Sequence, residues 1–341
     1  MATRRRTHAA VLLCTLAGLL VPGRGALAAE RRVQVADLSP EAEAAIKRGL
    51  DFLATNQNKD GSWGERYKPA ITALSLMAFM VKGHFPERGR HGARLDRAVG
   101  YLLRHGEQSS GYFGTSRQGM YEHGLATLAL SEVWGMSDRE GVRDALKRAV
   151  LIILGSQNGE GGWRYHPQPV DADLSVTVMQ IVALASAQEA GILVPAQVIR
   201  KAVDYVKSCH NKSSGGFGYQ RGGGSVKFSS TAAGVMSLLM CGERTGDHVD
   251  KGIAYLKRQP DSVFDHTSFY FYGHYYAIQA MYQAGEEHYQ AWYPRIQKAL
   301  LGKQRKDGSW TGGNESHPAY GTSMAILVLG VPYRFLPIYQ R

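Results

Sequence analysis

The sequence predicts an all-α fold in which six helical hairpins form a closed double ring. A short segment running from a polar residue, usually Gln, to Gly and an aromatic residue recurs every 46 to 54 residues, and a fixed period of this size indicates a repeat architecture. Each segment lies between an amphipathic stretch and a stretch that is apolar nearly all round. The last apolar stretch is as apolar as the others, whereas an open solenoid usually ends in a polar cap. The closing aromatic residues are Trp63, Phe113, Trp163, Phe217, Phe264 and Trp310.

The amphipathic stretches predict the outer helices of the ring. In the first unit Ile46, Leu50 and Leu53 recur at helical spacing among charged residues, and Val142 and Leu146 do so in the third. Such helices have one buried face and one exposed face.

The apolar stretches predict the inner helices, because a helix that is apolar on every side must be buried on every side. These stretches are residues 71–81, 124–133, 174–187, 231–240 and 323–331. The six hairpins are then expected at roughly 40–83, 92–135, 139–191, 195–242, 246–285 and 286–332. Residues 30–341 are therefore predicted to form a single domain.

Residues 1–29 have the features of a secretory signal peptide. Arg4, Arg5 and Arg6 form a basic start, Ala9 to Val21 form an apolar core too short to span a bilayer, and Ala26 to Ala28 offer a cleavage site. The adjacent arginines also allow a twin-arginine export signal. We expect an exported protein, periplasmic or extracellular.

Charge and composition exclude several partners. Removal of the signal segment with its four arginines lowers the formal net charge from +11 to +7, and this charge is spread along the chain, so we expect no nucleic acid. The mature sequence has no apolar run of about 18 residues, so no transmembrane segment is expected. No cofactor is predicted. Cys209 and Cys241 could pair or remain as free thiols.

The repeated segments resemble a known repeat. Gln57 to Trp63 and Gln304 to Trp310 are similar to the QW-type repeat of squalene–hopene cyclases and the prenyltransferase β-subunit family, and the likeness covers almost the whole mature chain. The resemblance implies an (α/α)6 toroid with an apolar, isoprenoid-like ligand in its central cavity. In the repeats themselves, the glutamine can donate to free carbonyls at a helix end, so we expect them to be structural.

One acidic segment suggests catalysis. Asp171 to Thr177 resembles the Asp-x-Asp-Asp-Thr element of squalene–hopene cyclases, whose middle aspartate is the general acid. The match implies that Asp173 is the acid and that Asp171 and Ser175 are its neighbours, although Leu174 stands where the family has an aspartate. Alternatively, Asp173 or Ser175 caps the following helix, which is worth about 1 kcal/mol.

A second segment, Phe269 to Tyr276, resembles the Tyr-His-Thr-Cys-Tyr stretch of prenyltransferase β-subunits, in which the histidine binds zinc. The resemblance gives His274 that position, but Ser229 to Thr231 stand where the family supplies its Asp-x-Cys pair, so no metal site is predicted. We retain His274 as a candidate catalytic group. It could equally be a satisfied polar residue within a buried helix.

Aromatic and titratable residues are expected around the cavity. Rings lining it could stabilise a carbocation or stack on a sugar, or they could simply pack in the core. The N-terminal ends of the inner helices would surround one mouth of the ring, where helix dipoles favour polar ligands. The expected ligand-binding residues are Glu122, His123, Ser175, Tyr270, Tyr272, Tyr275, His317 and Tyr320.

Three functions fit these features. The first is binding of an isoprenoid-like molecule, with catalysis left open. The second is a non-catalytic exported binding or scaffold protein with a protein partner, in which Tyr333, Phe335 and Tyr339 either dock or pack back on the ring. The third is a glycan-active enzyme. A wide apolar cavity would favour the first, a cavity filled by side chains the second, and a polar groove with paired carboxylates the third.

Overall fold

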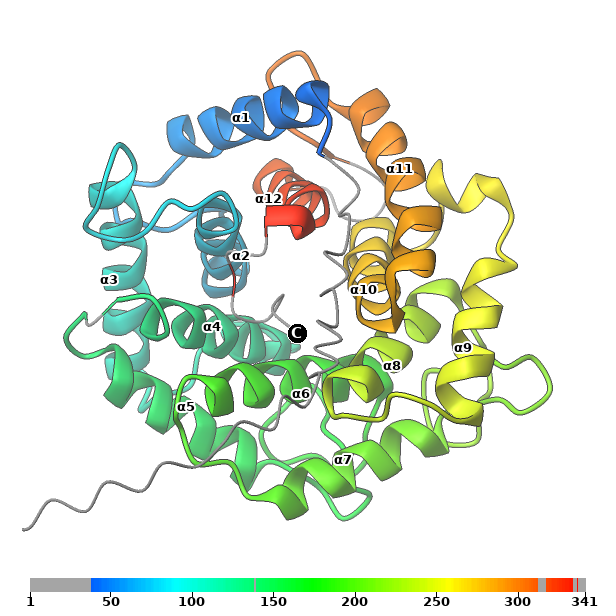
Figure 1. The fold of residues 1–341 in the computed structure, drawn as a ribbon. Coiled ribbons are helices and arrows are strands. Elements are labelled where there is room, and N and C mark those ends of the chain that lie inside the picture. Colours follow the sequence, from blue (N-terminus) through cyan, green and yellow to red (C-terminus); the bar gives the residue numbers. More distant parts are fainter. Residues whose placement is uncertain (1–37, 138, 312–316, 334–335, 337–341) are drawn as a thin grey trace, which may run out of the picture. The chain divides into compact units, whose positions relative to one another are not determined.

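Twelve α-helices form two concentric rings in the computed structural model (Figure 1), which describes residues 38–137, 139–311, 317–333 and 336. The outer helices are α1 (Pro40–Thr55), α3 (Gly92–Gln108), α5 (Val142–Gly155), α7 (Ala196–Ser208), α9 (Asp247–Lys257) and α11 (Glu286–Lys303). The inner helices are α2 (Lys68–Met80), α4 (Gly119–Trp134), α6 (Leu174–Glu189), α8 (Phe228–Met240), α10 (Tyr270–Ala284) and α12 (Pro318–Leu329). Two short 3-10 helices, η1 (Asp261–Phe264) and η2 (Val331–Tyr333), complete the description.

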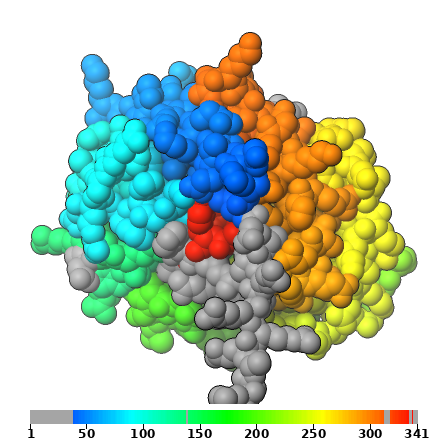
Figure 2. All heavy atoms as spheres, turned by 45° about the horizontal axis from the view of Figure 1, so that its top comes forward, coloured from blue at the N-terminus to red at the C-terminus, as the bar shows by residue number. Residues whose placement is uncertain are grey.

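The ring is closed because the first unit packs against the last. Helix α2 contacts both α4 and α12, and α1 contacts α11 and α12. Figure 2 shows the surface of the first unit, in blue, beside that of the last unit, in orange and red. The hydroxyls of Ser75 and Ser323 lie 3.0 Å apart across the α2–α12 contact, and the Gln304 amide donates to the Ala45 carbonyl at 2.8 Å. The predicted (α/α)6 toroid is confirmed.

Four inner helices, α2, α4, α8 and α12, begin earlier than their apolar stretches suggested, and the difference is largest for α4 and α12. Helix α4 begins at Gly119 and α12 at Pro318, each five residues before the expected start. Their first turns, 119–122 and 318–321, contain glycine, tyrosine, proline or glutamate rather than a run of aliphatic residues, so the apolar run starts only in the second turn. Glu122, His123 and Tyr320 therefore lie within these helices, and the prediction that they precede them was wrong.

In the first, third and sixth units the repeated segment joins its unit to the next. The Gln157 amide donates to the carbonyls of Gly161 and Val198, both at 2.9 Å, and so joins its own turn to the following outer helix. The indole of Trp163 donates to the Ile153 carbonyl at 2.8 Å. The same set of bonds recurs around Gln57 with Trp63 and around Gln304 with Trp310.

The glycine of the segment is required by its backbone. Gly161 has a φ of +90°, in the left-handed region that favours glycine, and a Cβ there would lie 2.5 Å from the Lys201 carbonyl oxygen. Any other residue would force the turn away from the next outer helix. Gly161 and Gln157 therefore both contribute to the contact between this turn and the next outer helix, α7.

Several other predictions can be compared with the described residues. Cys209 and Cys241 are free thiols. No described helix combines the length and the apolar character needed to cross a bilayer. Tyr333 packs back on the ring, since its hydroxyl donates to Glu43 and its ring lies 4.2 Å from the Lys82 ammonium. Phe335, Tyr339 and the predicted signal peptide lie outside the described residues.

A candidate binding cavity at one end of the ring

A cavity of about 360 Å³ lies among the inner helices. Its volume falls within the range of small-molecule sites. Five of the six inner helices contribute, all through their N-terminal caps or first two turns, so the cavity occupies the end of the ring where a site was expected. The lining residues are Tyr67, Ala70, Ile71, Leu74, Ser116, Gln118, Tyr121, Glu122, Leu125, Met179, Tyr272, Tyr275, Tyr276, His317, Tyr320 and Met324.

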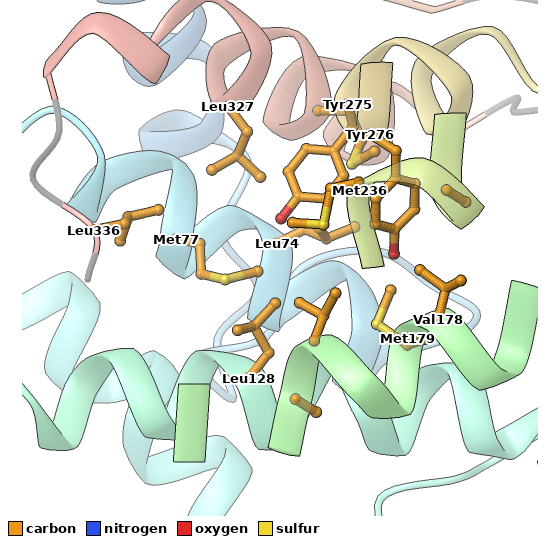
Figure 3. Close-up of a cluster of buried hydrophobic side chains, with 14 of the residues drawn as sticks. Leu74, Met77, Leu128, Val178, Met179, Met236, Tyr275, Tyr276, Leu327 and Leu336 are labelled. Atoms are coloured by element: carbon orange, nitrogen blue, oxygen red, sulfur yellow. The ribbon is translucent and has the colours of Figure 1, made fainter. Parts of the chain in front are cut away.

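The wall of this central cavity is mainly apolar and aromatic. Figure 3 shows the rings of Tyr275 and Tyr276 among aliphatic side chains that include Leu74 and Met179. Among the described lining residues the one carboxylate is Glu122. Its two oxygens accept hydrogen bonds from the backbone and the hydroxyl of Thr115, at 3.2 and 2.5 Å.

Two phenols of α10 are buried in the wall. Tyr272 and Tyr276 lie one turn apart, with ring centroids separated by 4.8 Å in an edge-to-face arrangement. Neither hydroxyl has a hydrogen-bond partner among the described residues. Burial raises the pKa of both phenols well above 10, so they remain neutral donors at ordinary pH.

A larger, polar hollow adjoins the central cavity. It shares Tyr67, Ser116 and Gln118 with the cavity and is otherwise lined by surface groups. We call it the vestibule. Its remaining residues are Glu65, Arg66, Lys68, Tyr101, Thr115, Arg117 and His166.

Tyr67 marks the boundary between the two spaces. It is the residue before α2 and has a φ of 53°, an uncommon conformation for a side chain of this size. Its side chain is 41% exposed. The backbone strain holds an aromatic ring at the mouth of the cavity.

Asp173 is the N-cap of α6, as the capping interpretation predicted. Its Oδ1 accepts hydrogen bonds from the Val176 backbone at 2.9 Å and from the Ser175 hydroxyl at 2.7 Å. Its Oδ2 lies 3.5 Å from Nη1 of Arg164. Burial raises the pKa of Asp173 above its usual value, although the hydrogen bonds from Val176 and Ser175 act in the opposite direction.

A chain of hydroxyls connects this carboxyl to the cavity. Neither Asp173 nor Ser175 lines the central cavity, but the Ser175 hydroxyl lies 2.5 Å from that of Tyr121, which does. Asp171 lies farther toward the surface and has Arg164 Nε 3.7 Å from its Oδ1. The cavity is therefore connected to Asp173 through Tyr121 and Ser175.

Two fully buried histidines, His123 and His274, belong to the repeat. In four units a threonine at the start of the inner helix accepts a hydrogen bond from the backbone of the closing aromatic residue, as Thr177 does from Trp163. His123 takes this place in the second unit, accepting from Phe113 at 3.2 Å. His274 is at the corresponding position of α10 in the fifth unit, with Nε2 3.0 Å from the Val263 carbonyl oxygen, but its Nδ1 accepts no such hydrogen bond from the described residues.

The structure thus brings together part of the predicted site. Glu122, Tyr272, Tyr275, His317 and Tyr320 line the central cavity. The lining does not include Asp171, Asp173, Ser175, His123, Tyr270 or His274.

Sequence reasoning missed two important lining residues, Tyr121 and Tyr276. Each is adjacent to, or one helical turn from, a residue that was predicted. Among the described residues no group of three His, Cys, Asp or Glu side chains is arranged to hold a metal ion.

Comparison with known proteins points to one class of fold. No protein-family model matches the chain. Lanosterol synthase of Mus musculus is 27% identical over 133 residues, 36% of this chain, and drimenyl diphosphate synthase of Streptomyces showdoensis is 30% identical over 149 residues, 41% of this chain. The matched segments cover only 18% and 26% of those two proteins.

Solved structures match over most of the chain. A variant of the type II terpene cyclase MstE from Scytonema, in complex with geranylgeranyl dihydroxybenzoate, has a TM-score of 0.62 at 15% identity over 87% of this chain and 98% of its own. An α-1,6-mannanase of Salegentibacter sp. has a TM-score of 0.63 at 6% identity over 86% of this chain and 98% of its own. Such identities show the fold alone. The chain has the toroid fold that type II terpene cyclases share with glycan-active enzymes.

Proposed function

We propose that this protein binds an apolar, isoprenoid-like molecule in the central cavity. The observation that carries the proposal is an unfilled space of about 360 Å³ with a wall of aliphatic and tyrosine side chains. Burying a hydrocarbon chain there yields about 0.8 kcal/mol for each methylene removed from water. The vestibule gives such a ligand an approach past Tyr67.

The alternatives fit this cavity less well. A scaffold protein needs no cavity, so packed side chains would be expected at the centre of its ring. Glycoside hydrolysis usually needs a pair of carboxyl groups flanking the sugar, whereas Glu122 is the one carboxylate among the described lining residues. The terpene cyclases among the structural neighbours support the isoprenoid class, and the predicted signal peptide supports export.

Acid catalysis by Asp173 is a second candidate function. One observation favours it: burial raises the pKa of the Asp173 carboxyl, which lies two hydroxyls from the cavity, and delivery of its proton requires the hydrogen bonds of Ser175 and Tyr121 to reverse. Asp173→Asn keeps a good N-cap and removes the acid. If the carboxyl acts as an acid, this variant abolishes conversion of a bound polyene such as farnesol, while Asp144→Asn on the exposed face of α5 retains it. Equal conversion by both variants would reject the acid role.

Binding is tested with a substitution that fills the cavity. Leu125 lines the cavity, and Leu125→Trp should occupy much of it; Leu151→Trp makes the same change on α5, where the side chain is 66% exposed. At about 100 times its dissociation constant, a ligand stabilises a protein by about 2.7 kcal/mol. Farnesol should raise the melting temperature of the wild type and of Leu151→Trp, but not of Leu125→Trp. An absent shift in the wild type, or equal shifts in both variants, would contradict the proposal.

A further inference from the structure

In the structure, the hydrogen bonds beside the cavity run toward Asp173. Oδ1 of Asp173 accepts from both Val176 and Ser175, so it is an acceptor whether or not a proton resides on Oδ2. A serine hydroxyl has a single hydrogen, and Ser175 gives it to Asp173. In the 2.5 Å contact with Tyr121, Ser175 must therefore accept and Tyr121 must donate.

This direction determines what Tyr121 can offer a ligand. Its single hydrogen is engaged by Ser175, so its phenol oxygen retains only acceptor capacity. A ligand group that meets this oxygen must bring a hydrogen of its own. An ether, a ketone or a hydrocarbon cannot do so, whereas an alcohol can.

The opposite wall offers the complementary group. The hydroxyls of Tyr272 and Tyr276 have no hydrogen-bond partner among the described residues, and each retains a hydrogen to donate. A buried donor without a partner costs about 1 to 3 kcal/mol, which a ligand oxygen can relieve. A hydroxyl group meets both demands, because it donates one hydrogen and accepts others.

We propose that the ligand of the central cavity is an isoprenoid alcohol whose hydroxyl donates to the Tyr121 phenol oxygen and accepts from the phenols of α10. This inference rests on the proposed binding of an apolar molecule and adds a neutral, hydrogen-donating end to it. The apolar remainder of the ligand lies against Leu74, Met179 and Met324. Ser175 and Asp173 then act as positioning residues, since they fix the direction in which Tyr121 points its hydrogen.

The test uses two probes that differ in the donor hydrogen. Purified protein is incubated with farnesol and farnesyl methyl ether in competition, and the bound mixture is extracted and quantified by gas chromatography. A buried hydrogen bond is worth about 1 kcal/mol or somewhat more, so the wild type should prefer the alcohol by roughly tenfold. Tyr121→Phe should reduce this preference to near one. Tyr293→Phe, which removes a buried hydroxyl bonded to the Leu329 carbonyl, should leave it unchanged.

The ether could bind less tightly because it lacks a donor hydrogen or because its methyl group is bulky. Ser175→Ala distinguishes these two causes. Without Ser175, Tyr121 can turn its hydrogen into the cavity, so the ether should bind more tightly than it does to the wild type. Equal binding of both probes by the wild type, or a preference that survives Tyr121→Phe, would overturn the inference while leaving apolar binding intact. Failure of the wild type to bind either probe would instead overturn the proposed function, and this inference with it.

Discussion

The hydroxyl of Tyr121 lies 2.5 Å from that of Ser175, and this contact joins the wall of the central cavity to the N-terminus of α6. The same serine donates to Asp173, which caps the helix. A change at the cap can therefore be transmitted to the cavity without any direct contact between Asp173 and a ligand.

The buried carboxyl should make stability depend on pH. Burial raises the pKa of Asp173 above its unfolded value near 3.9, so its contribution is present below that value and is lost as the pH rises through the folded pKa. Asp173→Asn cannot ionise and still caps α6. Its melting temperature relative to the wild type should be higher at pH 7 than at pH 3.5. If the melting temperature of Asp173→Asn relative to the wild type instead decreases as the pH rises from 3.5 to 7, Arg164 stabilises the ionised Asp173 more than burial disfavours it.

His123 and His274 should give stability the opposite pH dependence to Asp173. Burial lowers the pKa of His123 and of His274 from 6.5 to about 4. Their contribution is complete above pH 6.5 and is lost as the pH falls from 6.5 toward 4, because the unfolded chain takes up the proton first. By pH 5 the loss should reach about 2 kcal/mol per histidine.

His274→Thr introduces the residue that four other units use at this place. The variant should lose less unfolding free energy than the wild type between pH 7.5 and pH 5, as measured by urea denaturation at each pH. Tyr270→Phe removes a neighbouring hydrogen bond but keeps His274. It should therefore lose as much unfolding free energy as the wild type over this pH range. An unchanged pH dependence in His274→Thr would refute the assignment of His274 as a neutral structural residue.

Ring closure can be tested with equivalent glutamines. The Gln304 amide donates to the carbonyls of Gly308 in its own turn and of Ala45 in the first unit. The Gln157 amide donates to the equivalent carbonyls, those of Gly161 in its own turn and of Val198 in the fourth unit. In a closed ring, Gln304→Ala and Gln157→Ala should each cost about 1 to 3 kcal/mol of unfolding free energy. If calorimetry finds that Gln304→Ala hardly changes the unfolding free energy while Gln157→Ala lowers it, the ring is open between the last and the first unit.

The fold was predictable because each residue of the repeat has a local physical role. Gly161 is required by its turn, Gln157 by two carbonyls and Trp163 by the end of an outer helix, and such requirements recur with the unit. The period therefore predicts both the hairpins and their number. The helix starts were less predictable, since Gly119 and Pro318 precede the apolar run.

The site was only partly predictable. On α10, Tyr272, Tyr275 and Tyr276 face the cavity, whereas Tyr270 and His274 face the outer layer. Helical spacing separates these two sets, but both faces of the helix are buried, so the sequence does not tell which of them meets the cavity.

Asp173 illustrates a different limit. The sequence showed that it could be a cap or an acid, and the structure shows the cap. Its link to the cavity depends on Tyr121, which lies 54 residues from Ser175 in the chain. A contact at that separation arises from the packing of α4 against α6 and has no local sequence pattern.

Native mass spectrometry of the protein purified from its own cells shows whether the cavity holds an apolar molecule. We expect the wild type to carry an added mass that solvent extraction releases as an isoprenoid, and Leu125→Trp purified in the same way to carry none. A wild-type protein with no added mass, or an added mass that persists unchanged in Leu125→Trp, would contradict the proposed binding.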